Sequence, residues 1–176
     1  MTQTARPNAD DSTGGWASTE SDLHSAIDEG SVSDSDYISA TDGEMSGSAL
    51  VCQIGLESVS DPSDHTNTKF VYRWKGEGYG DGSIAFTAAL KSGSSTIVTS
   101  NPSYAGSFTT VTVNLSTSEA SSISNYNDLS LVFSATDTAT SGSTIAKVSW
   151  AYFECPSASG GSAKIPVTLF INGMST

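Results

Sequence analysis

The stretch that decides the fold is Lys69–Lys75, which reads Lys-Phe-Val-Tyr-Arg-Trp-Lys. Its aromatic rings alternate with basic side chains. The rings are those of Phe70, Tyr72 and Trp74, and the basic groups are those of Lys69, Arg73 and Lys75. Successive side chains of a strand point to opposite faces, so this period of two predicts a strand with one face in a core and one in solvent. A sugar-stacking platform is the alternative for the aromatic face, but large rings are usually buried, and we predict core.

Further segments along the chain show the same alternation of apolar and polar residues. They span residues 37–38, 49–56, 83–90, 96–99, 108–115, 129–135 and 145–155. Short strands separated by Gly, Ser, Asn and Asp are typical of antiparallel sheets. We therefore predict an all-β fold, an antiparallel β-sandwich of jelly-roll type with one or two short helices.

Two segments are predicted to be helical. Thr19–Asp22 opens like a capped helix, and Leu23, Ala26 and Ile27 follow at helical spacing. Ser116, with a glutamate three residues later, forms the capping box of a single turn between two strands. A strand, one helical turn and a further strand indicate a crossover between two sheets.

The length of 176 residues suits one domain with a core of its own. We divide it into an extended N-terminal arm (1–15), a β-sandwich (16–156), a Gly/Ser-rich linker (157–163) and a C-terminal strand or tail (164–176). The last strand can fold back onto its own sheet or add to a neighbouring subunit's sheet.

The charge of the chain argues against two classes of partner. With 19 acidic and 7 basic residues, its net charge is −12, which disfavours nucleic acid and anionic membranes. No apolar run has the length of a membrane span or the form of a leader. We therefore expect a chain made in a cytoplasm that does not leave by the general secretory route.

The two cysteines, Cys52 and Cys155, each lie in an apolar, strand-like run. In a reducing compartment, two buried thiols are the simpler interpretation, and a disulfide between neighbouring strands is the alternative.

A metal site is possible in the acidic stretch that holds Asp34, Asp36, Asp42 and Glu44. Calcium needs several oxygen ligands around a tight loop, and the EF-hand spacing fails because Ile38 occupies a ligand position. We favour a solvated acidic loop and predict no metal ligands and no cofactor.

No catalytic constellation is evident, and the sequence predicts a protein that is not an enzyme. Glycoside hydrolysis needs two carboxylates across a cleft, but the spacing pairs none of the candidates. Those candidates are Glu44, Glu57, Glu77 and Glu154. His24 and His65 accompany no nucleophile motif, so surface histidines are favoured. The glycine-dense stretch 75–82 opens no helix, which disfavours a phosphate cradle.

Several segments resemble the small β-sandwich proteins found among the virion genes of tailed bacteriophages. They are RPNADDSTGGW, IDEGSVSDSDYI, FVYRWKGEG, SIAFTAAL, LSTSEASSISNYNDLSLVFSA and VSWAYFECP, and together they span about residues 6–156. The resemblance implies a non-enzymatic capsid decoration (cement) protein. Such a protein is made in the host cytoplasm, is often a homo-trimer, and binds the major capsid protein on the capsid surface of the virion.

Two segments are expected to contact a partner. One is the N-terminal arm with Arg6, Pro7 and Trp16. The other is the tethered strand with Ile165, Val167, Leu169 and Ile171. The alternative is a carbohydrate-binding or receptor-binding module that uses exposed rings such as Tyr79, Tyr104 or Tyr126. A glycan-cleaving enzyme is the least favoured hypothesis because no carboxylate pair is evident.

Overall fold

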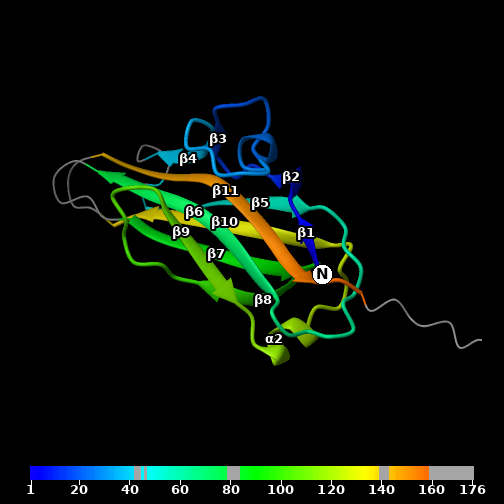
Figure 1. Ribbon diagram of the computed structural model, residues 1–176. Helices are drawn as coiled ribbons and strands as arrows, with labels where there is room; N and C mark the ends of the chain where they lie inside the picture. Colours follow the sequence, from blue (N-terminus) through cyan, green and yellow to red (C-terminus); the bar gives the residue numbers. More distant parts are fainter. Residues whose placement is uncertain (42–44, 46, 79–83, 139–142, 159–176) are drawn as a thin grey trace, which may run out of the picture.

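The computed structural model describes residues 1–41, 45, 47–78, 84–138 and 143–158, which form two packed antiparallel sheets (Figure 1). The first sheet holds β1 (Thr2–Ala5), β3 (Ala17–Ser18), β4 (Ile38–Thr41), β6 (Lys69–Gly78), β9 (Thr109–Asn114) and β11 (Thr144–Pro156). The second holds β2 (Pro7–Ser12), β5 (Leu50–Leu56), β7 (Ile84–Ser92), β8 (Ser95–Ser100) and β10 (Leu129–Asp137). Two short helical segments accompany them, η1 (His24–Ala26) and α2 (Thr117–Ser121).

The strand order is that of a jelly roll. One sheet contains the order β4-β11-β6-β9, and the other contains β5-β10-β7-β8. Consecutive strands from β4 to β7 thus alternate between the sheets, as two interlocking Greek keys require. The predicted all-β sandwich of jelly-roll type is confirmed. Within the described residues, no helix has the length and apolar character needed to cross a membrane.

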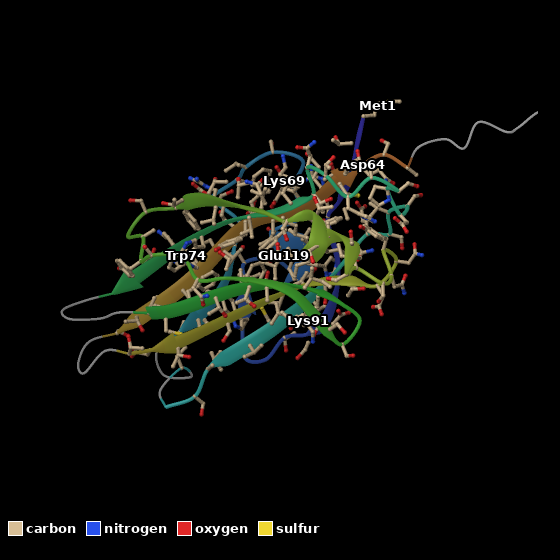
Figure 2. The ribbon with its side chains drawn as sticks, turned by 90° about the horizontal axis from the view of Figure 1, so that it is seen from below. Met1, Asp64, Lys69, Trp74, Lys91 and Glu119 are labelled. Atoms are coloured by element: carbon tan, nitrogen blue, oxygen red, sulfur yellow. The ribbon has the colours of Figure 1, made fainter. Side chains whose placement is uncertain are left out.

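The core lies between the sheets and is rich in aromatic rings. Trp74 of β6 stacks on Phe86 of β7 with ring centroids 4.4 Å apart, which joins one sheet to the other. Tyr72 packs edge-on against Phe133 of β10 at 6.2 Å. Trp74 lies between the strands in Figure 2. The predicted core face of the stretch 69–75 is confirmed because its three rings are fully buried.

The opposite face of β6 carries the basic side chains toward solvent. Each basic group lies beside an acid, which reduces the local excess of charge. The pairs are Lys69 with Glu154, Arg73 with Asp34, and Lys75 with Glu77.

The predicted N-terminal arm is corrected. Residues 1–15 are not a free arm, because β1 pairs with β11 in one sheet and β2 pairs with β5 in the other. These strands are polar, a composition that is also typical of unpaired chain. An edge strand needs only backbone hydrogen bonds on one side, so polarity does not exclude it from a sheet.

The predicted helix near residues 19–29 is also corrected, since only the single 3-10 turn η1 forms there. The carboxylate of Asp10 accepts hydrogen bonds from the backbone N–H groups of Leu23 and His24, both at 2.8 Å. This long-range cap fixes one turn against β2.

The capping box in the crossover is confirmed. Ser116 Oγ accepts the N–H of Glu119 at 3.2 Å, and the Glu119 carboxylate accepts the N–H of Ser116 at 2.7 Å.

The two cysteines are buried free thiols, on β5 and β11 of different sheets. Burial raises the pKa of Cys52 to about 12, so this thiol stays protonated near neutral pH. The structure thus has two separate buried thiols, the simpler of the two interpretations.

The Asp10 cap makes stability depend on pH. Burial alone would raise the pKa of Asp10, but its hydrogen bonds with Leu23 and His24 outweigh burial and hold it below the usual value. A carboxylate with a lowered folded-state pKa stabilises above the unfolded-state pKa of about 4, and this contribution is lost as the pH falls through the folded value. We expect Asp10→Asn to lower the free energy of unfolding by about 1–2 kcal/mol at pH 7 and by less at pH 3.

Urea unfolding of both proteins at the two pH values measures this difference. Asp11→Asn is the control, because Asp11 lies next in β2 and does not cap η1. An equal deficit for Asp10→Asn at pH 7 and pH 3 would contradict the assignment.

Candidate functional site

A polar pocket of about 480 Å³ opens at the end of the sandwich where β1 begins and β11 ends. Three segments line it, and we call it the loop-end pocket. Its residues are Gln3, Ser58, Val59, Ser60, Asp61, Ser124, Asn125, Tyr126 and Asn127. Figure 2 shows Met1 and Asp64 at this same end of the molecule. Loops held at the end of a rigid sandwich are common positions for binding residues.

Gln3 joins two walls of the pocket. Its side-chain Nε2 donates to the carbonyl oxygens of Ser60, at 2.8 Å, and Pro156, at 2.9 Å. Its Oε1 accepts the N–H of Ser60 at 2.9 Å. One amide thus ties the start of β1 to the loop after β5 and to the end of β11.

Tyr126 anchors the third wall. Its ring is buried against Phe153, and its hydroxyl donates to the carbonyl of Ala120 at 3.3 Å. His65 Nδ1 lies 3.2 Å from the same hydroxyl. The backbone N–H of Val59 donates to the Tyr126 carbonyl at 3.2 Å, which links the two loops directly. The pocket is therefore held in shape by the fold.

Asp61 supplies the charge of the pocket, since no lysine or arginine lines it. Burial is the largest cause that raises the pKa of Tyr126, and the neighbouring Cys155 and Asp61 add to it, so that the pKa is about 12. Burial is also the largest cause that raises the pKa of Cys155, and the negative charges of Glu154 and Asp61 add to it, so that the pKa is about 11. The phenol and the thiol are thus both neutral at physiological pH, and the pocket has negative character.

Four lining side chains are available to a ligand. Within the described part of the chain, those of Ser58, Ser60, Asp61 and Asn127 form no hydrogen bond, and all four residues are exposed. Hydroxyl, carboxylate and amide groups together both donate and accept. This arrangement can bind a molecule that carries several hydrogen-bonding groups.

A smaller pocket, of about 330 Å³, lies beside Tyr104 and is lined by Gly76, Glu77, Gly78 and Gly106. The Tyr104 ring is 49% exposed, and its hydroxyl donates to the Gly76 carbonyl at 3.1 Å. Of the three rings named for ligand binding, Tyr104 is exposed and Tyr126 is buried. Tyr79 lies outside the described residues.

The acidic stretch does not assemble a metal site within the described residues, where no group of three metal-binding side chains occurs. Both carboxylate oxygens of Asp34 bind Arg73, at 2.8 and 2.7 Å, and this hydrogen bonding lowers the pKa of Asp34. Asp36 accepts from the hydroxyls of Ser33 and Ser35. Asp42 and Glu44 lie outside the described residues.

The glutamates considered for glycoside hydrolysis have separate partners. Glu57 accepts the N–H of Arg6, Glu77 pairs with Lys147 at 3.1 Å, and Glu154 pairs with Lys69 at 3.0 Å.

Neither histidine is a free surface group. His24 Nδ1 lies 2.9 Å from Asp10, and His65 stacks near Tyr126 beside the loop-end pocket.

The residues predicted to contact a partner fall into two groups. Pro7 is buried, and Trp16 is only 4% exposed and packs near Phe133. The guanidinium of Arg6 donates to the carbonyl of Glu29. The other group, Ile165, Val167, Leu169 and Ile171, lies outside the described residues. For both groups, contact with a partner stays a prediction.

Sequence reasoning named Tyr126 but missed the rest of the loop-end pocket. Gln3 falls in the expected arm, and the segments 58–61 and 124–127 are polar loops without a motif. The chain offers no local signal that these three segments meet, because strand pairing brings them together.

We compared the chain with protein families, curated proteins and solved structures, and only the solved structures gave a match. No known protein family matches the chain, and no curated protein matches it. Among solved structures, it is similar to the Stig cyclase Fisc from Fischerella sp. TAU in complex with (3Z)-3-(1-methyl-2-pyrrolidinylidene)-3H-indole. Identity is 14%, the TM-score is 0.37, and the match covers 85% of this chain and 89% of the cyclase.

This match corrects two predictions. The similar structure is a cyclase with a bound small molecule, and the prediction of a non-enzymatic capsid decoration protein is not kept. The prediction that the protein is not an enzyme is likewise not kept, since the similar structure is that of a cyclase. The TM-score of 0.37 is too low to assign the cyclase's reaction to this chain. The phage resemblance, the virion location and the homo-trimer stay predictions.

Proposed function

We propose that this protein binds a small polar molecule, rich in hydroxyl or amine groups, in the loop-end pocket. One observation carries the proposal. The walls are fixed by Gln3 and Tyr126, while four exposed polar side chains of the lining have no partner in the described chain. A rigid frame with free hydrogen-bonding groups lowers the entropy cost of binding.

The size and polarity of the pocket indicate the class of ligand. Small-molecule sites usually measure about 300–1,000 Å³, and this pocket of about 480 Å³ lies within that range. Most such sites are apolar, whereas Val59 is the one aliphatic residue in this lining. A ligand must therefore offer many hydrogen bonds rather than apolar surface.

The negative charge of the pocket further limits the class of ligand that it can bind. Asp61 is the one ionisable carboxylate in the lining, and the chain carries a net charge of −12. Like charges repel and opposite charges attract, so a neutral or cationic molecule is favoured over an anionic one.

Titration calorimetry with matched sugars tests the proposal. The probes are a neutral hexose, the corresponding amino sugar and the corresponding sugar acid. We expect the amino sugar to bind most tightly and the sugar acid at least tenfold more weakly. Nuclear magnetic resonance shifts should change at residues 58–61 and 124–127 during the titration.

Asp61→Asn is expected to weaken amino-sugar binding about tenfold, because one charge-assisted hydrogen bond corresponds to about 1.4 kcal/mol. Binding of the neutral sugar should change little. Asp64→Asn is the matched control, since Asp64 is an exposed acid of the same loop that does not line the pocket. Equal effects of the two substitutions, or no binding of any probe at millimolar concentration, would contradict the proposal.

A further inference from the structure

The two sheets have five edge strands among the described residues, and four of them are short or otherwise protected against pairing with another chain. The edge strands are β1, β3 and β9 in the first sheet, where β1 pairs with β11 alone, and β2 and β8 in the second. Strands β1 and β3 are short, with four and two residues. Strand β2 contains Pro7, Asp10 and Asp11, and its register with β5 shifts twice. The pairing of β8 with β7 also shifts register, and α2 contacts β8. Short length, proline, charge, bulges and cover all block edge pairing.

The fifth edge, β9, has none of these devices. Its sequence is Thr-Thr-Val-Thr-Val-Asn, without proline or charge, and it pairs with β6 in unbroken register. In Figure 1, β9 forms the edge of its sheet beside β6. No described strand pairs with its outer side. Threonine and valine favour extended structure, so β9 is an open template for a further strand.

The direction of the backbone groups along β9 follows from a hydrogen bond between the residues directly beyond the ends of β9 and β6. The N–H of Leu115 donates to the carbonyl of Thr68, toward the inside of the sheet. Antiparallel backbone groups alternate between the two sides, so the N–H and C=O groups of Thr110, Thr112 and Asn114 face outward. These three residues are exposed.

The segment that carries this edge is itself uncharged, and the charged groups nearest to it are the ion-paired side chains of β6. Residues 92–118 contain no Asp, Glu, Lys or Arg, although the chain as a whole carries a charge of −12. The segment includes β8, β9 and the connection between them. Two copies of such an acidic protein repel each other, and the repulsion is weaker at an edge whose own strand carries no charge and whose neighbouring charges are paired.

We propose that two copies of this chain associate through their β9 strands, paired antiparallel about a two-fold axis at Thr112. Thr112 then faces its counterpart, and Thr110 of each copy faces Asn114 of the other. Each facing pair exchanges backbone hydrogen bonds, and cross-strand threonine pairs are favourable. The β9 edge is self-complementary, as a two-fold interface requires. The first sheet thereby continues from one copy into the next.

Sedimentation equilibrium of the full chain across a range of concentrations tests the proposal. We expect a reversible dimer whose dissociation constant falls as salt rises, because screening reduces the repulsion between two acidic copies. Thr112→Lys places a charge on the edge, and Thr112→Pro removes an outward N–H. Each should raise the dissociation constant at least tenfold. Ser12→Lys adds the same charge on the protected β2 edge and should leave the dissociation constant unchanged.

Hydrogen exchange identifies the occupant of the edge. Amide protection at Thr110, Thr112 and Asn114 should rise with protein concentration. Protection that is independent of concentration would mean that a segment of the same chain covers the edge, which would overturn the proposal. A monomer at all concentrations, or a dimer that Thr112→Lys leaves intact, would also overturn it. Circular dichroism checks that each variant remains folded.

Discussion

Trp74→Ala is expected to lower the free energy of unfolding by about 3–5 kcal/mol, the usual cost of removing a large buried ring. Trp74 is 1% exposed and stacks on Phe86 of the opposite sheet at 4.4 Å. Its loss leaves a cavity at the contact between the two sheets, and the surrounding strands cannot collapse into it without breaking their pairing. Urea unfolding followed by circular dichroism measures the change.

Two further variants make this expectation specific. Tyr104→Ala removes an aromatic side chain that is half exposed and should cost about 1 kcal/mol. Trp74→Phe retains most of the stacking and should cost less than Trp74→Ala. Similar losses for Trp74→Ala and Tyr104→Ala would show that the Trp74–Phe86 contact does not hold the sheets together.

Gly14→Ala is expected to lower the free energy of unfolding by about 2–5 kcal/mol. Gly14 has a φ of +52°, a conformation that costs any residue with a Cβ. A Cβ built there would lie 1.7 Å from the carbonyl oxygen of Val51. That oxygen belongs to the backbone of β5, so relief requires moving a strand of the second sheet.

Gly47→Ala separates the two causes. Gly47 also has a positive φ, +80°, but no atom lies within 4 Å of the position that a Cβ would take there. It should cost only the backbone penalty, about 1–2 kcal/mol. If the two substitutions are equally destabilising, the close approach to Val51 contributes nothing. Thermal unfolding of both variants against the unchanged protein decides this.

The loop-end pocket and the β9 edge use different parts of one scaffold. The pocket is formed by loops that meet beyond the strand ends, whereas the edge is a regular strand. The Asp61 and Thr112 substitutions are therefore expected to act independently. Ligand binding without dimerisation, or dimerisation without ligand binding, would support one proposal and leave the other to be judged by its own experiment.

Much of the sandwich was predictable because each long strand buries one face. The alternation at 69–75 predicted β6 and its buried rings, and Ser116 with Glu119 predicted the α2 capping box. Both signals are local, since they depend on the period of a strand and on the reach of one side chain.

The misleading segments depend on contacts that are remote in the sequence. Strands β1 and β2 have no hydrophobic face that would mark them, and their pairing depends on the edges of β11 and β5. The expected helix shrinks to one turn where Asp10 caps it from another strand. The functional expectation failed for a different reason, because one sandwich architecture serves many unrelated functions.

The sequence by itself determined the fold class, the core face of β6, the capped crossover turn and the net negative charge. All of these follow from side-chain periodicity, local hydrogen bonding or composition, whereas a bulge between Val148 and Trp150 changes which face of β11 enters the core. Only the tertiary structure decided that Gln3, Asp61 and Asn127 border one pocket and that β9 is an open edge. Both depend on the order in which strands pair, and no short stretch of sequence encodes that order.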